Sequence, residues 1–120
     1  MKKIVLIGGY PKGFAEPFHI KTRSGKILRK IVSDIKISPI FFDLWNNQKE
    51  EDLRKLKPST IKQLNNFIKS KYILIALGRY IDKVLIDNQY QCIYLPHPAS
   101  RDKKYINALK IGLSKIIINN

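Results

Sequence analysis

The chain has 120 residues, of which 44% are hydrophobic, so residues 1–120 suit one domain with a substantial core. Its 23 Lys and Arg against 9 Asp and Glu give a net charge of +14, which favours a polyanionic partner, nucleic acid above all, unless an AT-rich genome alone explains the lysines. No apolar stretch approaches the roughly 20 residues of a membrane span, and a single cysteine excludes internal disulfides and cysteine-rich metal sites. We expect a cytoplasmic monomer without a membrane partner, metal or cofactor.

The first third of the chain predicts a strand followed by a helix. Residues 3–8, KIVLIG, form a continuous apolar run that ends in glycine, which is typical of a buried parallel strand. Ser24 is a candidate N-cap for a helix over residues 25–35, because serine is among the preferred capping residues. The apolar side chains on one face of this helix are Ile27, Leu28, Ile31 and Ile35.

The middle third predicts a second strand, a loop and a second helix. Residues 38–45, SPIFFDLW, predict the strand, and the polar, charged residues 46–57 predict a loop or an irregular turn. Residues 58–70 begin with Pro and Ser and then space their apolar side chains as in a helix. Those apolar side chains are Ile61, Leu64 and Ile68.

The last third predicts strands over residues 72–78 and 90–96, each followed by a helix, over residues 79–85 and 101–118. Strands that alternate with helices imply right-handed crossovers and a parallel sheet that is covered on both faces. We therefore expect an α/β protein with three layers, α/β/α, and a four-stranded parallel sheet.

Ligands of such sheets bind beyond the carboxyl ends of the strands. The distinctive residues of this chain follow those ends: the segment GGYP at residues 8–11, Asp43, the pair Gly78-Arg79, and the segment HPASR at residues 97–101. We expect the functional site at this edge of the sheet.

Three segments of the chain, in this order and spacing, resemble the uracil-DNA glycosylase superfamily. They are GGYP…PF…SGKIL (8–28), LIALGRYIDKVL (74–85) and LPHPASR (95–101), and the resemblance covers nearly the whole chain. It implies a four-stranded parallel sheet with helices on both faces. It also implies hydrolysis of the N-glycosidic bond of a damaged base that is flipped out of DNA.

The resemblance implies a role for several single residues. His97, held between two prolines, matches the donor that stabilises the departing base. Phe18 matches the aromatic residue on which the flipped base stacks, and Gly8 and Gly9 would let the backbone approach that base. The alternatives are that His97 merely ends a strand and that Phe18 is ordinary core.

Basic residues gather near the same motifs and are expected to bind DNA, although a solvated basic face is the simpler explanation. A helix that starts near Ser24 would hold one phosphate. Arg101 lies where members of the superfamily place a wedge that props open the base stack. The expected DNA-binding residues are Lys12, Ser24, Lys26, Ser100 and Arg101, with Lys21, Arg23, Arg29, Lys103 and Lys104 nearby.

Two positions depart from the pattern of the superfamily. The first motif usually carries an Asp, Asn or Glu that handles water, whereas this chain has Tyr10, and a phenol is a poor base at neutral pH. Glu16 is the nearest carboxylate in the sequence. Asp43 aligns with an Asn that reads uracil, and an ionised carboxylate only accepts hydrogen bonds. Asp43 therefore indicates that the substrate base is not uracil, that its carboxyl is protonated, or that a neighbouring amide, Asn46 or Asn47, reads the base instead. The simpler alternative is that Asp43 only ends a strand.

Two other function classes compete with a glycosylase. A non-catalytic nucleic-acid-binding module would have the same fold without the water-activating group, as Gly9, Tyr10 and Asp43 suggest. It would bind DNA in a salt-dependent way and form no product. A protein that acts on free nucleotides or nucleosides would have little affinity for DNA.

Overall fold

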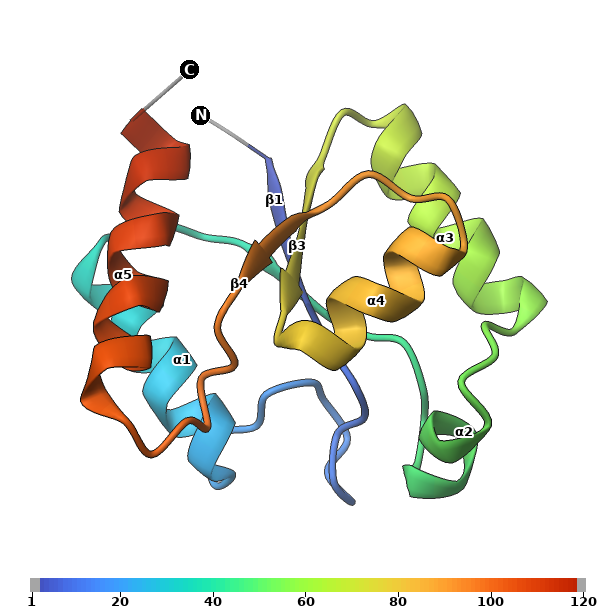
Figure 1. The fold of residues 1–120 in the computed structure, drawn as a ribbon, viewed down its shortest axis with the longest axis horizontal. Helices are drawn as coiled ribbons and strands as arrows, with labels where there is room; N and C mark the ends of the chain where they lie inside the picture. The colour runs from blue at the N-terminus through green and yellow to red at the C-terminus, as the bar shows by residue number, and fades with distance from the viewer. Residues whose placement is uncertain (1–2, 119–120) are drawn as a thin grey trace.

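The computed structural model describes residues 3–118. Four parallel strands form one sheet in the order β2-β1-β3-β4 (Figure 1). The strands are β1 (Ile4–Gly8), β2 (Ile40–Asp43), β3 (Ile73–Leu77) and β4 (Ile93–Leu95). The helices are α1 (Arg23–Asp34), α2 (Gln48–Leu53), α3 (Pro58–Lys69), α4 (Arg79–Asp87) and α5 (Lys103–Ile118). The expected three-layer α/β/α class is therefore confirmed.

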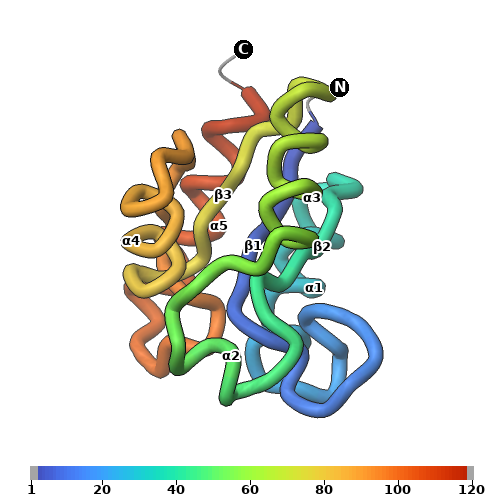
Figure 2. Tube along the Cα trace, turned by 90° about the vertical axis from the view of Figure 1, so that its right-hand side faces the viewer, coloured from blue at the N-terminus to red at the C-terminus, as the bar shows by residue number. Residues whose placement is uncertain are grey.

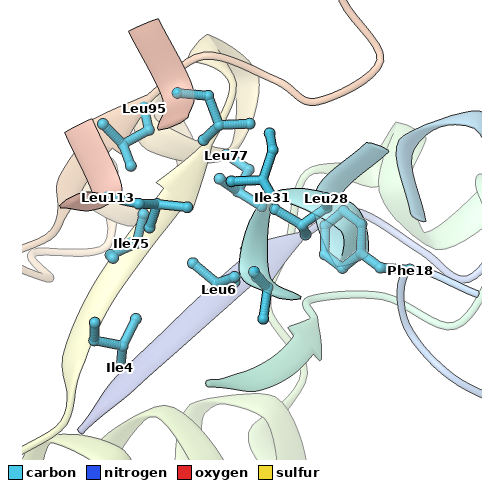
Figure 3. Packing of buried hydrophobic residues seen from close by; sticks show 11 residues of the cluster. Ile4, Leu6, Phe18, Leu28, Ile31, Ile75, Leu77, Leu95 and Leu113 are labelled. Atoms are coloured by element: carbon cyan, nitrogen blue, oxygen red, sulfur yellow. The ribbon is translucent and has the colours of Figure 1, made fainter. Parts of the chain in front are cut away.

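Helices cover both faces of the sheet. Figure 1 shows α1 and α5 on one side, and Figure 2, turned toward the other side, shows α3 and α4 in front of the strands. Along β1, Leu6 packs into the cluster under α1 and α5 (Figure 3), whereas Val5 and Ile7 pack into the cluster under α3 and α4. Because both faces of β1 are buried, the strand is apolar along its length.

The start of α1 differs from the prediction. Thr22, and not Ser24, is the N-cap, and its Oγ1 accepts a hydrogen bond from Gly25 N at 2.9 Å. Ser24 is a buried residue of the first turn. Gly25 lies against the backbone of the preceding loop, where a β-carbon would come within 2.6 Å of the carbonyl carbon of Phe18. This close approach places the loop before α1 directly on the helix.

The prediction of a loop over residues 46–57 was wrong, because these residues contain the short helix α2. Asn47 caps it, with Oδ1 accepting a hydrogen bond from Glu50 N at 2.9 Å. Arg54 ends it in the left-handed conformation, at φ 57°. The helix has no buried residue, so apolar periodicity could not reveal it.

The predicted helix over residues 58–70 is present as α3, but only one of the three apolar side chains that indicated it is buried. Leu64 is fully buried, but Ile61 and Ile68 are 36% and 47% exposed. The helix turns a different stripe to the sheet, in which Thr60 and Phe67 flank Leu64 at helical spacing. Thr60 is tolerated there because its hydroxyl donates a hydrogen bond to the carbonyl oxygen of Leu44 at 3.2 Å.

None of the helices within residues 3–118 combines the length and the apolar composition that a membrane crossing requires.

Candidate functional site

A cleft of about 390 Å³ lies beyond the carboxyl ends of the strands. The chain passes from β1 to β2 on one side of the sheet and from β3 to β4 on the other, so the cleft opens at the switch point between β1 and β3. Its lining residues come from the last residues of β2 and β3, from the segments that follow β1, β3 and β4, and from α1, α2 and α4. They are Gly9, Tyr10, Pro11, Lys12, Phe18, Thr22, Ser24, Asp43, Gln48, Glu51, Leu77, Gly78, Arg79, Tyr80, Ile81 and His97.

Gly8 explains how Phe18 and Asp43 come together. A β-carbon at position 8 would lie 2.9 Å from Asp43 Oδ1 and 2.9 Å from Phe18 Cε2. The absence of a side chain at Gly8 therefore leaves the space that both groups use. An aromatic ring and a carboxyl group therefore meet over the end of β1.

Phe18 belongs both to the core and to the cleft. It is 7% exposed and lies at the margin of the apolar cluster under α1 (Figure 3). Its backbone is left-handed, at φ 51°, a conformation that costs a residue without special partners roughly 1–3 kcal/mol. Arg29 holds the loop in this conformation, because its guanidinium donates to Phe18 O at 2.6 Å and to Pro17 O at 3.0 Å.

Arg29 is therefore not one of the free cations expected around the first motif. Its guanidinium also lies 4.3 Å from the centre of the Phe41 ring and 3.9 Å from Glu16 Oε1. Both Glu16 and Arg29 lie outside the cleft lining. Glu16, the carboxylate nearest to the first motif in sequence, thus pairs with Arg29, which holds the Phe18 loop.

His97 lines the cleft, and a hydrogen bond fixes which of its ring nitrogens carries the proton. Its Nδ1 accepts a hydrogen bond from Ala99 N at 3.0 Å, so the proton of the neutral ring is on Nε2. Burial, together with the charge of Lys12, lowers the pKa of His97 below its usual 6.5. The ring packs on Gly78, whose φ is 98°, and a β-carbon there would lie 3.3 Å from His97 Cβ. His97 is thus a neutral Nε2–H donor at neutral pH.

Asp43 carries an unpartnered oxygen. Within the described part of the chain, Oδ2 of Asp43 is the buried side-chain atom that has no hydrogen-bond partner. Burial, and next the charge of Glu51, raise the pKa of Asp43 from 3.8 to about 7. Near neutral pH the group therefore exists in both its protonated and its ionised form. The protonated form offers a donor and an acceptor on one edge, as an amide does.

Glu51 is the site residue that the sequence reasoning missed. Its carboxylate lies on the backbone of Gly9, with Oε2 in the space that a side chain at position 9 would fill. Burial raises the pKa of Glu51, and Asp52 adds to the effect, whereas Lys12 opposes it. One signal could have indicated the helix that carries it, because Asn followed three residues later by Glu is a typical helix start.

Tyr10 lines the cleft, but its hydroxyl is turned to α2. It donates a hydrogen bond to Gln48 Oε1 at 2.5 Å, and its ring packs against the cluster under α3 and α4. Asn46 and Asn47, the amides considered as alternatives to Asp43, are exposed and lie outside the lining. Asn47 is occupied as the cap of α2. Among these candidates the cleft contains Asp43 alone.

The expected DNA-binding residues divide into two groups. Lys12 and Ser24 line the cleft, whereas Lys26 and Arg101 are exposed outside it. Ser100 lies outside the lining too, and its carbonyl oxygen accepts a hydrogen bond from Arg23 Nη2 at 3.5 Å. Arg23 thereby ties the start of α1 to the loop that carries His97.

The comparisons with known proteins assign no family to the chain. A scan against protein-family models, a search of curated proteins and a search of solved structures each found no match. Within residues 3–118, no three His, Cys, Asp or Glu side chains gather closely enough to hold a metal ion. The resemblance to the uracil-DNA glycosylase superfamily thus stays a prediction.

Proposed function

We propose that the protein is a DNA glycosylase that hydrolyses the N-glycosidic bond of a flipped damaged or deaminated base, uracil or a related one. One observation carries the proposal. A single cleft at the switch point of the sheet holds an aromatic ring (Phe18), a carboxyl with an unpartnered oxygen (Asp43) and a neutral imidazole donor (His97). These supply a surface for stacking, a reader of the base edge and a donor to the departing base.

Phe18 would receive the face of the flipped base. Stacking on an aromatic side chain contributes roughly 1–3 kcal/mol per base and tolerates any base. Flipping costs a few kcal/mol, and least at a damaged or mispaired base. Because Arg29 already holds the loop of Phe18, little further ordering is needed when the base arrives.

Asp43 would read the edge of the base. Uracil presents an acceptor, O4, next to a donor, N3–H. A protonated Asp43 matches this pair, since it donates to O4 and accepts from N3–H. An ionised Asp43 accepts only and would repel O4, and it suits a base with two adjacent donors. With a pKa of about 7, Asp43 favours uracil in the acidic half of the neutral range.

His97 would stabilise the leaving group. As the bond between C1′ and the base nitrogen breaks, its electron pair moves into the base, and negative charge grows on the base oxygens. A hydrogen bond from Nε2–H of His97 to one of these oxygens stabilises the departing anion. Loss of one such donor costs about 100- to 1,000-fold in rate in other enzymes.

The charge of the protein supports DNA as the partner. The net charge is +14, and Lys12 and Arg79 lie in the lining of the cleft itself. Phosphate contacts from such residues position DNA without reading its sequence. We also propose that the protein is located in the cytoplasm and that it is a monomer.

The test is cleavage of labelled oligonucleotides that carry uracil, hypoxanthine, xanthine or a mismatched thymine, each single-stranded and duplex, with alkaline scission of the abasic product. We expect cleavage of at least one substrate and a loss of about 100-fold or more in His97→Ala. His19→Ala is the control, because the second histidine lies outside the cleft lining. A His97→Ala protein with full activity would rule out this mechanism.

The non-catalytic binding module remains the competing function, supported by the hydroxyl of Tyr10, which is engaged with Gln48. It predicts DNA affinity that falls steeply with salt, and no abasic product from any substrate. A protein that acts on free nucleosides predicts little affinity for either form of DNA. The same assay, run with a binding measurement at two salt concentrations, separates the three functions.

A further inference from the structure

The proposed reaction needs a group that holds and deprotonates water, and the first motif supplies none. Gly8 and Gly9 have no side chain, and Tyr10 donates its hydroxyl proton to Gln48. The carboxylate of Glu51 comes from a distant part of the chain and covers Gly9. Four of the nine Asp and Glu residues of this basic protein lie between positions 43 and 52, and two of the four, Asp43 and Glu51, line the cleft.

We propose that Glu51 is the catalytic base, which delivers from α2 the carboxylate that the segment of residues 8–11 lacks. The inference rests on the proposed glycosylase function and assigns a residue to its water-activating step. The position of the carboxylate carries it. Glu51 Cδ lies 3.4 Å from the place of a β-carbon at Gly9, so the carboxylate stands where an acidic side chain at position 9 would stand.

Hydrogen bonds hold Glu51 in that position. Gln48 Nε2 donates to Glu51 Oε1 at 3.4 Å, and Gln48 Oε1 accepts from the hydroxyl of Tyr10 at 2.5 Å. The hydroxyl of Tyr80 donates to the carbonyl oxygen of Glu51 at 2.6 Å. Tyr10 and Tyr80 are thus positioning residues of this carboxylate, and Tyr10 acts through Gln48 and not as a base itself.

The oxygen of water forms a bond with C1′ of the deoxyribose while the bond from C1′ to the base nitrogen breaks. The electron pair of the broken bond goes to the base, where His97 stabilises it. One water proton goes to the carboxylate of Glu51, which later returns it to the base or to solvent. The products are a free base and an abasic site, and no other reactant is needed.

Asp43 and Glu51 have different roles in this proposal: Asp43 reads the base edge in its protonated form, and Glu51 accepts the water proton in its ionised form. The charge of Glu51 raises the pKa of Asp43, so an ionised Glu51 favours a protonated Asp43. Lys12, in the lining of the cleft, favours the ionised form of Glu51. The combination of an ionised base and a protonated reader of uracil is the one that the reaction requires.

The first test compares variants on the oligonucleotide that the unmodified protein cleaves fastest. We expect Glu51→Gln to lower kcat by about 100-fold or more, the usual contribution of a general base, while KM changes little. Asp87→Asn is the matched control, since it removes one carboxylate charge from an exposed ion pair on α4, outside the cleft lining. It should keep its kcat. A Glu51→Gln protein with the kcat of the unmodified protein overturns the assignment.

The second test returns a carboxylate to the first motif. The Glu51→Ala substitution empties the space beside Gly9 that the Glu51 carboxylate fills. Because the backbone of Gly9 is not in the left-handed region, an Asp fits at position 9 in this variant. We expect the double variant Gly9→Asp/Glu51→Ala to recover at least about 10-fold in kcat over Glu51→Ala, a part of the general-base contribution. A folded double variant that is no more active means that Glu51 acts through packing, and it overturns the inference.

The two proposals fail in different ways. If the unmodified protein cleaves no substrate, the glycosylase function fails, and the role of Glu51 with it. If the unmodified protein cleaves DNA, His97→Ala does not, and Glu51→Gln does, then only the role of Glu51 is wrong.

Discussion

The ring of Phe18 lies over the backbone of Gly8, in the space that a side chain at position 8 would fill. Gly8 ends β1, and Phe18 follows ten positions later in a loop. Their contact forms one wall of the pocket from two parts of the chain. The aromatic surface is available to the cleft only because β1 ends in glycine. This relationship is testable without any substrate.

Gly8→Ala should destabilise the protein and displace Phe18. The new β-carbon would lie 2.9 Å from both Phe18 Cε2 and Asp43 Oδ1, and overpacking of a buried site costs about 2 kcal/mol. Urea unfolding measures the loss. Phe18→Leu in the same chain should relieve part of it, and strictly additive effects of the two substitutions would contradict the contact.

Asp43→Asn should stabilise the protein above pH 7. The pKa of Asp43 is 3.8 in an exposed reference state and about 7 in the fold, so between these values the folded state binds more protons than the unfolded state. The free energy of unfolding therefore falls as pH rises from 4 to 7. Asn cannot ionise, so the substitution removes this loss of folding stability. The loss is on the order of a few kcal/mol, since each pKa unit corresponds to about 1.4 kcal/mol.

Unfolding midpoints of Asp43→Asn and of the unmodified protein, measured from pH 4 to pH 8, provide the check. The two curves should converge near pH 4, diverge as the pH rises from 4 to 7, and stay apart by a constant difference above pH 7. Asp87→Asn, at an exposed ion pair on α4, is the reference for the loss of one charge. Parallel curves for Asp43→Asn would contradict a buried, unpartnered carboxyl.

Recognition of uracil should weaken as the pH rises through about 7. Only the protonated Asp43 offers a donor to O4, so KM for a uracil substrate should increase with ionisation of the carboxyl. In Asp43→Asn the amide makes both hydrogen bonds at any pH, and KM should lose this dependence. Steady-state kinetics between pH 6 and pH 8 decide the question, and a KM that is flat in the unmodified protein would count against Asp43 as the reader.

His97 should be neutral at pH 7 with its proton on Nε2. The hydrogen bond from Ala99 N to Nδ1 selects this tautomer, and burial lowers the pKa. Nitrogen NMR of the imidazole measures both, and the His19→Gln variant assigns the two histidines. A titration midpoint above 6.5 would contradict the effect of burial on the pKa, and a neutral ring with its proton on Nδ1 would lack the donor that the mechanism uses.

Arg29→Met should cost about 2 kcal/mol, because two carbonyl oxygens lose hydrogen bonds from a charged donor. Arg29→Lys should recover little, since an ammonium lacks the planar fork that reaches both oxygens. Lys30→Met, at an exposed cation of the same helix, is the control. Equal stability of the Arg29→Met and Lys30→Met proteins would show that Arg29 does not hold the Phe18 loop.

Local patterns were sufficient for most of the fold. Buried parallel strands are apolar on both faces, so runs such as KIVLIG are visible in any window of the sequence. The alternation of these runs with helical periods then predicted the layers. Local patterns failed for α2, which has no buried residue. They predicted α3, but they did not show that Thr60 rather than Ile61 faces the sheet.

The sequence by itself determined the strands, the layers and the edge of the sheet where Gly8, Asp43 and His97 lie, because these follow from short-range apolar patterns and from the general geometry of parallel sheets. Only the tertiary structure decided which groups meet there. Burial set the pKa of Asp43, and a hydrogen bond within the loop set the tautomer of His97. The packing of a polar helix brought Glu51 onto Gly9, 42 residues away in the chain. Contacts between residues so distant leave no local signal in the sequence.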